Sequence, residues 1–118
     1  MRSRADALAA YERFVSRVRA NGSAFAVEDT DDNSPALCDS HEIAKAQVLL
    51  LFSDRAYAER IRARFGNSAG VVEISREDLL AKTLPFMLDA GFAVGPNWDA
   101  DLAGVEIDPA ELRARLRN

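Results

Sequence analysis

The residues best able to do chemistry lie in one short segment, residues 38–42, which reads Cys-Asp-Ser-His-Glu. Cys38 is the only cysteine of the chain and His41 is its only histidine. A cysteine becomes a nucleophile when its pKa is lowered and a base lies within hydrogen-bond reach. Such pairs are generally brought together by the fold from distant positions, so closeness in sequence is a weak signal. On a strand, Cys38 is expected to be a small buried hydrophobe.

Metal and cofactor sites have little support in the sequence. A structural zinc site takes four cysteine or histidine ligands and a catalytic one about three, whereas this chain holds one of each residue. Residues 29–33 (Asp-Thr-Asp-Asp-Asn) bring oxygen donors together, but the glycine and distal glutamate of a calcium loop are missing. The six glycines stand singly at predicted element ends and form no phosphate-binding pattern. We therefore expect no metal and no other cofactor.

Trp98 is a second candidate, because it lies beside Asn97 in a polar loop, residues 96–101 (Pro-Asn-Trp-Asp-Ala-Asp). A large aromatic side chain in such a loop either packs beneath it or is presented to a partner. We favour packing and keep partner contact as the alternative. Asp99 and Asp101 are interpreted as loop acids, since nothing places them across a cleft. The candidate binding residues are therefore Trp98, Asn97, Cys38 and His41.

Length and composition restrict the class of protein. A chain of 118 residues is predicted to be a single domain, residues 1–118, and 48% hydrophobic with 29% charged residues is typical of a globular fold. No apolar run approaches the roughly 20 residues of a membrane-spanning helix, and the N-terminus shows no export signal. A single cysteine fits a reducing cytoplasm, and a formal net charge of −4 argues against nucleic-acid binding. We expect a cytoplasmic protein that binds neither membranes nor nucleic acids.

Two of the predicted helices lie near the ends of the chain. Residues 5–20 carry apolar side chains at three- and four-residue spacing, and either Asn21 or Gly22 can end the helix in the left-handed conformation. The last helix should begin at residues 108–111 (Asp-Pro-Ala-Glu), where a capping acid, a first-turn proline and a reciprocating glutamate stand in register. Leu112 and Leu116 are expected to face inward.

The middle of the chain is predicted to hold the other helices. Ser53 or Asp54 should cap a helix that ends at residues 66–68 (Gly-Asn-Ser). Ser75 should cap the next one, which Pro85 is expected to kink or restart, because proline has no amide hydrogen to donate.

The sequence also predicts strands at residues 24–27, 36–38, 47–52, 71–74, 92–95 and 102–107. The first two should pair as a hairpin across the polar tract 28–35, and the last two as a hairpin across residues 96–101. Residues 47–52 are almost unbroken in apolar character, which is typical of a strand near the sheet centre that is covered on both faces. We predict an α+β fold, with a mixed, largely antiparallel sheet of about five or six short strands and three to four helices packed on it.

The order of these segments also points to a family. The relevant motifs are Tyr-Glu-Arg-Phe at 11–14, Ala-Leu-Cys-Asp at 36–39, Leu-Phe-Ser-Asp-Arg-Ala-Tyr-Ala at 51–58, Ile-Ser-Arg-Glu-Asp-Leu-Leu at 74–80, Leu-Pro at 84–85, Val-Gly-Pro-Asn at 94–97 and Asp-Pro-Ala-Glu-Leu at 108–112. In this order they resemble the bacterial family called domain of unknown function 2750. A looser likeness is to the N-terminal domain of SseB-like proteins. These motifs are mostly caps and turns, so the resemblance implies a fold and a bacterial origin but no catalytic residue.

Since the identifiable motifs are structural, we expect a non-enzymatic protein. It should bind another protein, or its own copy, through an exposed sheet edge or through the loop that carries Trp98. The alternative is a thiol-dependent or small-ligand-binding protein that uses the segment around Cys38 and His41.

Overall fold

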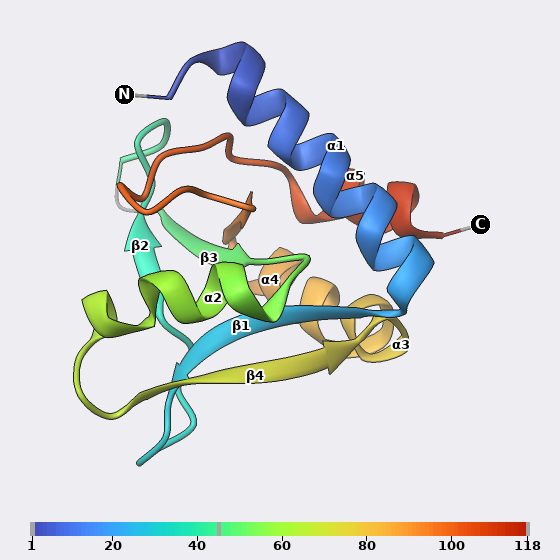
Figure 1. The fold of residues 1–118 in the computed structure, drawn as a ribbon. Helices are drawn as coiled ribbons and strands as arrows, with labels where there is room; N and C mark the ends of the chain where they lie inside the picture. Colours follow the sequence, from blue (N-terminus) through green and yellow to red (C-terminus); the bar gives the residue numbers. More distant parts are fainter. Residues whose placement is uncertain (1, 45, 118) are drawn as a thin grey trace.

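The computed structural model describes residues 2–44 and 46–117. The helices are α1 (Arg4–Asn21), α2 (Arg55–Arg62), α3 (Arg76–Asp78), α4 (Leu84–Ala90) and α5 (Pro109–Leu116). A 3-10 turn, Ala63–Phe65, continues α2, and a π-helical turn, Leu79–Thr83, joins α3 to α4. The strands are β1 (Ser23–Asp29), β2 (Leu37–Asp39), β3 (Gln47–Leu51), β4 (Ala69–Ser75) and β5 (Ala93–Pro96). This arrangement confirms the predicted α+β class (Figure 1).

The strands of the described residues form two sheets that meet at one corner. β1 and β4 pair antiparallel along their whole length. In the second sheet β3 is central, antiparallel to β2 and parallel to β5. Phe25 and Phe52 exchange two backbone hydrogen bonds of 2.8 Å, which join the end of β3 to β1. The pairing is therefore mixed and largely antiparallel, as predicted, with the strands divided between two sheets.

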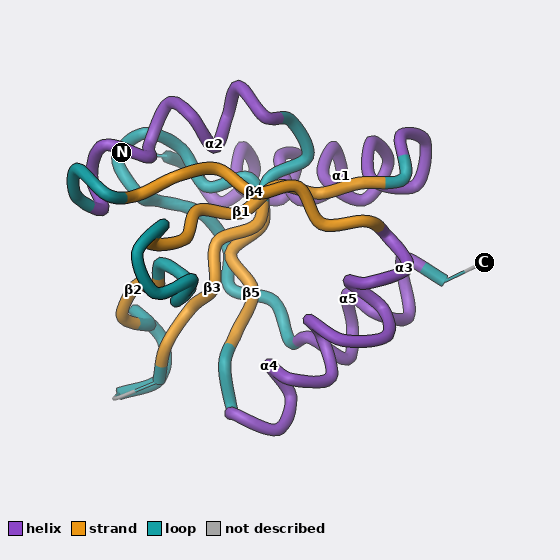
Figure 2. The backbone as a smooth tube through the Cα atoms, turned by 90° about the horizontal axis from the view of Figure 1, so that it is seen from below, coloured by secondary structure: helices purple, strands orange, loops and turns teal. Residues whose placement is uncertain are grey.

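β3 is buried on both faces, as its apolar sequence predicts. Because successive side chains of a strand point to opposite faces, Leu49 and Leu51 pack with α1, α4 and α5, while Val48 and Leu50 pack with α2 and Trp98. Figure 2 shows α4 and α5 together on one side of β5, and β2 on the other side of β3. β3 thus separates the two hydrophobic clusters of the protein.

The first predicted hairpin is wrong in its return strand. The polar tract does turn back, since the amide of Asp29 donates to Ser34 O at 2.8 Å and that of Ala36 donates to Val27 O at 2.9 Å. β2 then leaves β1 and pairs with β3 instead. β4 takes one edge of β1, and β2 supplies hydrogen bonds to the buried β3, whose backbone groups must be paired.

The second predicted hairpin is also wrong. β5 pairs with β3, and residues 102–107 form no strand. Val94 and Ile107 still exchange two backbone hydrogen bonds of 2.8 Å, but the chain between them is irregular. Asn97 and Leu102 have positive φ angles of 49° and 57°, which fold this loop over the Trp98 ring. Burial of the indole beneath this segment thus replaces the strand predicted at residues 102–107.

The predicted helix ends at Gly22, Ser75 and Asp108 are confirmed by their local geometry. Asp54 stands at the N-cap of α2, but its side chain makes no capping hydrogen bond, and the carboxylate of Glu111 accepts a hydrogen bond from the Tyr11 hydroxyl. Gly22 ends α1 with a φ of 80°. The hydroxyl of Ser75 accepts a hydrogen bond from the Asp78 amide at 3.0 Å, and the Asp108 carboxylate accepts one from the Ala110 amide at 2.7 Å. Local caps of this kind need no long-range partner, so they can be predicted from short segments.

The effect of Pro85 is confirmed as well. The π-helical turn ends at Thr83, and α4 begins at Leu84 with Pro85 in its first turn. Because proline cannot donate to the preceding turn, the regular α-helical pattern stops and restarts here.

No helix within residues 2–44 and 46–117 combines the length and apolarity needed to cross a membrane.

Candidate functional site

Asn97 lies at the carboxyl end of β5 and is 3% exposed. Its Oδ1 accepts a hydrogen bond from the Ser53 amide at 2.9 Å, and its Nδ2 donates to the Ser53 hydroxyl at 3.0 Å and to Ala10 O at 3.3 Å. The side chain therefore ties together the ends of β3 and β5 and the middle of α1. Its amide groups are bonded within the protein, so the role that the structure gives Asn97 is internal.

Trp98 packs beneath its own loop and is 1% exposed. Its Nε1 donates to Val105 O at 2.7 Å. A Cβ atom added to Gly95 would lie 2.7 Å from the ring, and one added to Gly104 would overlap it, so both glycines allow the backbone to approach the indole. This is the packing arrangement that the sequence favoured for Trp98.

The structure gives Cys38 and His41 no catalytic arrangement. Cys38 is half-buried in β2, and burial raises the pKa of its thiol, with a further rise from the charge of Asp39. The exposed His41 stacks its ring on Trp98, with centroids 6.1 Å apart. No hydrogen bond joins Cys38 to His41 in the part of the chain that is described. A thiol with a raised pKa is mostly protonated near neutral pH, which is the opposite of an activated nucleophile.

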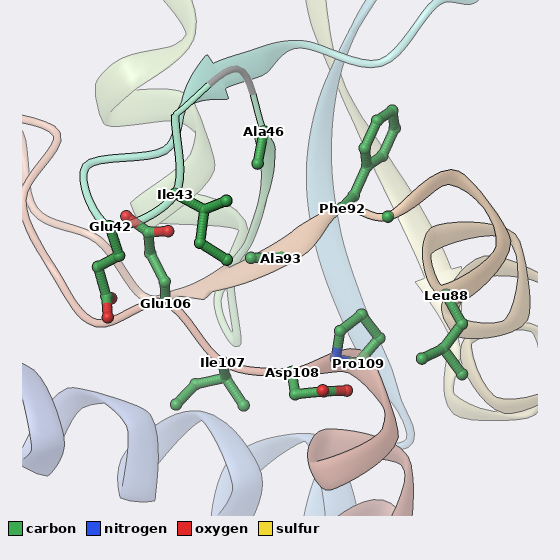
Figure 3. Close-up of a pocket in the computed structure, with 11 residues that line it drawn as sticks. Glu42, Ile43, Ala46, Leu88, Phe92, Ala93, Glu106, Ile107, Asp108 and Pro109 are labelled. Atoms are coloured by element: carbon green, nitrogen blue, oxygen red, sulfur yellow. The ribbon is translucent and has the colours of Figure 1, made fainter.

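A pocket of about 310 Å³ opens between the segment after β2 and helix α4; we call it the α4 pocket (Figure 3). Its apolar lining includes Ile43, Leu88, Phe92, Ile107 and Pro109. Its carboxylates are those of Glu42, Glu106 and Asp108. These residues come from three separate parts of the chain, which the parallel pairing of β3 with β5 and the Val94–Ile107 bridge bring together.

The apolar part of this surface is unusually exposed. Ile43 is 63% exposed, Phe86 56% and Leu88 40%. The ring of Phe86 packs edge-on against that of Phe92, with ring centroids 5.9 Å apart. This contact links the α4 pocket, which Phe92 lines, to a second apolar groove, which Phe86 lines. Contiguous exposed apolar side chains of this kind mark contact surfaces more often than isolated ones do.

The acidic side of the pocket is formed by Glu42 and Glu106, whose side chains lie on the same side in Figure 3, across from Leu88 and Phe92, with their carboxylates turned in opposite directions. Glu106 accepts hydrogen bonds from the Ser40 hydroxyl and, at 2.7 Å, from the His41 amide. It therefore holds the segment after β2 against residues 105–107. The carboxylate of Glu42 has no hydrogen bond or ion pair with the described residues.

The Asp108 carboxylate is used differently, because it caps α5. None of the lining residues that are described is basic. Within the described ranges, no group of three or more His, Cys, Asp or Glu side chains could hold a metal ion. The arrangement can bind an apolar group beside a cation.

Comparison with known families adds one positive finding. A family model described as Protein of unknown function (DUF2750) matches residues 11–116. The chain belongs to this family. The DUF2750 match confirms the resemblance seen in the ordered motifs, and it spans all the residues of the α4 pocket. No curated protein and no solved structure shows a significant match, and the looser likeness to SseB-like proteins stays a prediction.

The pocket of this DUF2750 member was missed from the sequence because its residues are ordinary ones. One signal was present in α4, Leu-Pro-Phe-Met-Leu-Asp-Ala. Leu84 and Met87 are buried, and Phe86 and Leu88 are exposed, so this short helix is apolar on more sides than the core can cover. The outer face of this short helix is therefore apolar and exposed.

Proposed function

We propose that this protein is a non-enzymatic domain that binds another protein through the α4 pocket and the apolar side chains beside it. The observation that carries the proposal is the exposure of Ile43, Phe86 and Leu88 on one linked surface. Removing apolar area from water stabilises a complex by about 25 cal/mol per Å² before the costs of association. A partner that covers these side chains would therefore gain binding energy without any change in the fold.

The state of the other candidate groups supports a non-enzymatic role. The thiol of Cys38 has a raised pKa, and Asn97 and Ser53 are bonded to each other in the interior. Acid, base and nucleophilic catalysts need an accessible group with a pKa suited to proton transfer or attack. Among the described residues, those singled out for their chemistry contribute to packing instead.

The proposed contact surface differs from the one expected from the sequence. Trp98 itself is buried and presents almost no area to a partner. The same loop contributes its later residues, Glu106 and Ile107, to the wall of the α4 pocket. The proposal includes a bacterial cytoplasmic location, for which the family likeness and the unpaired Cys38 are the support.

The test compares capture of partners by three purified, tagged proteins: wild type, Leu88→Ser and Leu8→Ser. Leu8 and Leu88 are both 40% exposed, but Leu8 lies on α1 and outside the α4 pocket, so it is a matched control. We expect wild type and Leu8→Ser to enrich the same partner from a lysate of the parent organism. Leu88→Ser should reduce binding of that partner, once purified, by about tenfold or more, as loss of an interface anchor does.

Two results would count against the proposal. A partner bound equally by wild type and Leu88→Ser would place the contact elsewhere on the surface. A protein that stays monomeric and enriches no partner under any growth condition would remove the case for a binding role. Circular dichroism of all three proteins controls for loss of fold.

A further inference from the structure

We infer that the partner presents to the α4 pocket a short segment in which an apolar side chain stands close to an arginine or lysine. This inference rests on the proposed function and specifies the chemistry of the partner. It follows from the size of the pocket, from its two unlike sides and from the state of its carboxylates.

The size of the pocket restricts what can enter it. About 310 Å³ is at the small end of ligand sites, which span about 300–1,000 Å³. A space of this size suits one or two side chains of a peptide better than a large cofactor. The floor and wall formed by Ile43, Phe92 and Ile107 favour an apolar side chain there.

The charge of the pocket restricts what can stand beside that apolar group. Glu42 and Glu106 lie on one side and Leu88 on the opposite side, so that a ligand filling the pocket meets carboxylates and apolar groups together (Figure 3). No described lining residue offers a positive charge. An acidic residue at this side would be repelled by both carboxylates and an uncharged one would leave that of Glu42 without a charged partner in the ligand, whereas a basic residue would complement them.

Glu42 is the group best placed to select the basic residue. Glu106 is occupied by Ser40 and His41, and Asp108 by the first turn of α5, whereas the Glu42 carboxylate has no bond to the described residues. A guanidinium can meet a carboxylate through two parallel hydrogen bonds, so arginine should be preferred over lysine.

The experiment selects binders from a random twelve-residue peptide library displayed on phage, with immobilised wild-type protein as the target. We expect enriched peptides to carry Leu, Ile, Phe or Met with an excess of Arg or Lys nearby. For a synthetic copy of one such peptide, Glu42→Lys should weaken binding about fivefold or more at low salt, since it removes one attraction and adds a repulsion. Raising the salt concentration should narrow this difference, because the charges are exposed.

A matched control separates the local charge from the charge of the whole protein. Glu77 is an exposed glutamate on α3, outside the α4 pocket, so Glu77→Lys changes the net charge by the same amount. The peptide should bind Glu77→Lys as it binds wild type. Equal weakening by both substitutions would overturn the inference, because the attraction would then come from the overall charge.

The other outcomes distinguish this inference from the proposed function. Apolar peptides without basic residues that still lose binding in Leu88→Ser would overturn the inference and leave the proposed function standing. Peptides that bind Leu88→Ser as well as wild type would count against both. The inference would also be overturned by a dimer in solution that buries Leu88, or by a selection that yields no peptide. In either case the proposed function would be tested by the capture experiment alone.

Discussion

The loop that carries Trp98 and the α4 pocket are both built in part from residues 97–107, yet they differ in the kind of residue that each contains. The first part of this stretch holds Trp98 and Asn97, which could do chemistry but are buried and bonded within the protein. The pocket side holds Ile43 and Leu88, which have no special chemistry but remain exposed. A candidate contact surface is therefore indicated less by residue type than by whether the side chain is already buried and bonded within the protein.

The difference has a simple energetic basis. A buried indole contributes a large apolar area to the core, and its N–H must find an acceptor, which Val105 O supplies. The hydrogen-bonding groups of Asn97 are used up in the same way. By contrast, Ile43 and Leu88 contribute little burial free energy in the isolated protein. They would gain on contact with a partner, because most of their remaining exposed area is apolar.

The strongest test of this comparison is Trp98→Ala. Removal of a fully buried aromatic side chain should lower the free energy of unfolding by about 3–5 kcal/mol, since it leaves a cavity between β5 and residues 102–105. Denaturant unfolding followed by circular dichroism measures this. Trp98→Phe should cost less, because it keeps most of the ring and loses the hydrogen bond to Val105 O. A loss below about 1 kcal/mol for Trp98→Ala would mean that the indole is not part of the core.

A smaller loss is expected for Asn97→Ala. The substitution leaves the amide of Ser53 without its acceptor, which costs about 1–3 kcal/mol. It also puts alanine at a φ of 49°, for which asparagine has a better tolerance. Asn97→Gly removes the same hydrogen bonds, but glycine adopts a positive φ without strain. The Asn97→Gly variant should therefore be more stable than Asn97→Ala by about 1 kcal/mol. Equal stability of the two variants would show that backbone conformation plays no part.

The thiol of Cys38 allows a chemical test of the same idea. Because burial raises its pKa, the fraction of thiolate at neutral pH should be lower than in a model peptide, and access is reduced as well. Alkylation of the native protein should therefore be slow at neutral pH and rise only above the pH at which an ordinary thiol ionises, about 8.5. Fast alkylation at neutral pH would revive the thiol-dependent alternative for Cys38 and His41.

Much of the fold could be predicted because its signals are local. Ser75, Asp108 and Gly22 mark helix ends through contacts that span a few residues, and the apolar run of β3 reports its own burial. The errors concern contacts between distant segments. β2 pairs with β3 instead of β1, and residues 102–107 follow the buried Trp98 instead of forming a strand.

The candidate site was harder to predict for the same reason. A cysteine, a histidine and a tryptophan attract attention by type, but the exposure of Ile43 depends on how the segment after β2 is held by Glu106, 63 residues further along the chain from Ile43. The opposing wall comes from α4, through Leu88. No pattern within a short window reports that these segments meet, since their positions depend on the pairing of β3 with β5.

The smallest effect is expected for Ile43→Ser. Since Ile43 is 63% exposed, its replacement should change the free energy of unfolding by no more than about 0.5 kcal/mol, the range of ordinary surface substitutions. The same change of an aliphatic side chain to serine at the fully buried Leu84 should cost several times more, because it opens a cavity and buries a hydroxyl. Unfolding in denaturant compares the two variants directly. A large loss of unfolding free energy in Ile43→Ser would show that this side chain belongs to the core. The contrast between the buried residues of the Trp98 loop and the exposed residues of the α4 pocket would then be wrong for Ile43.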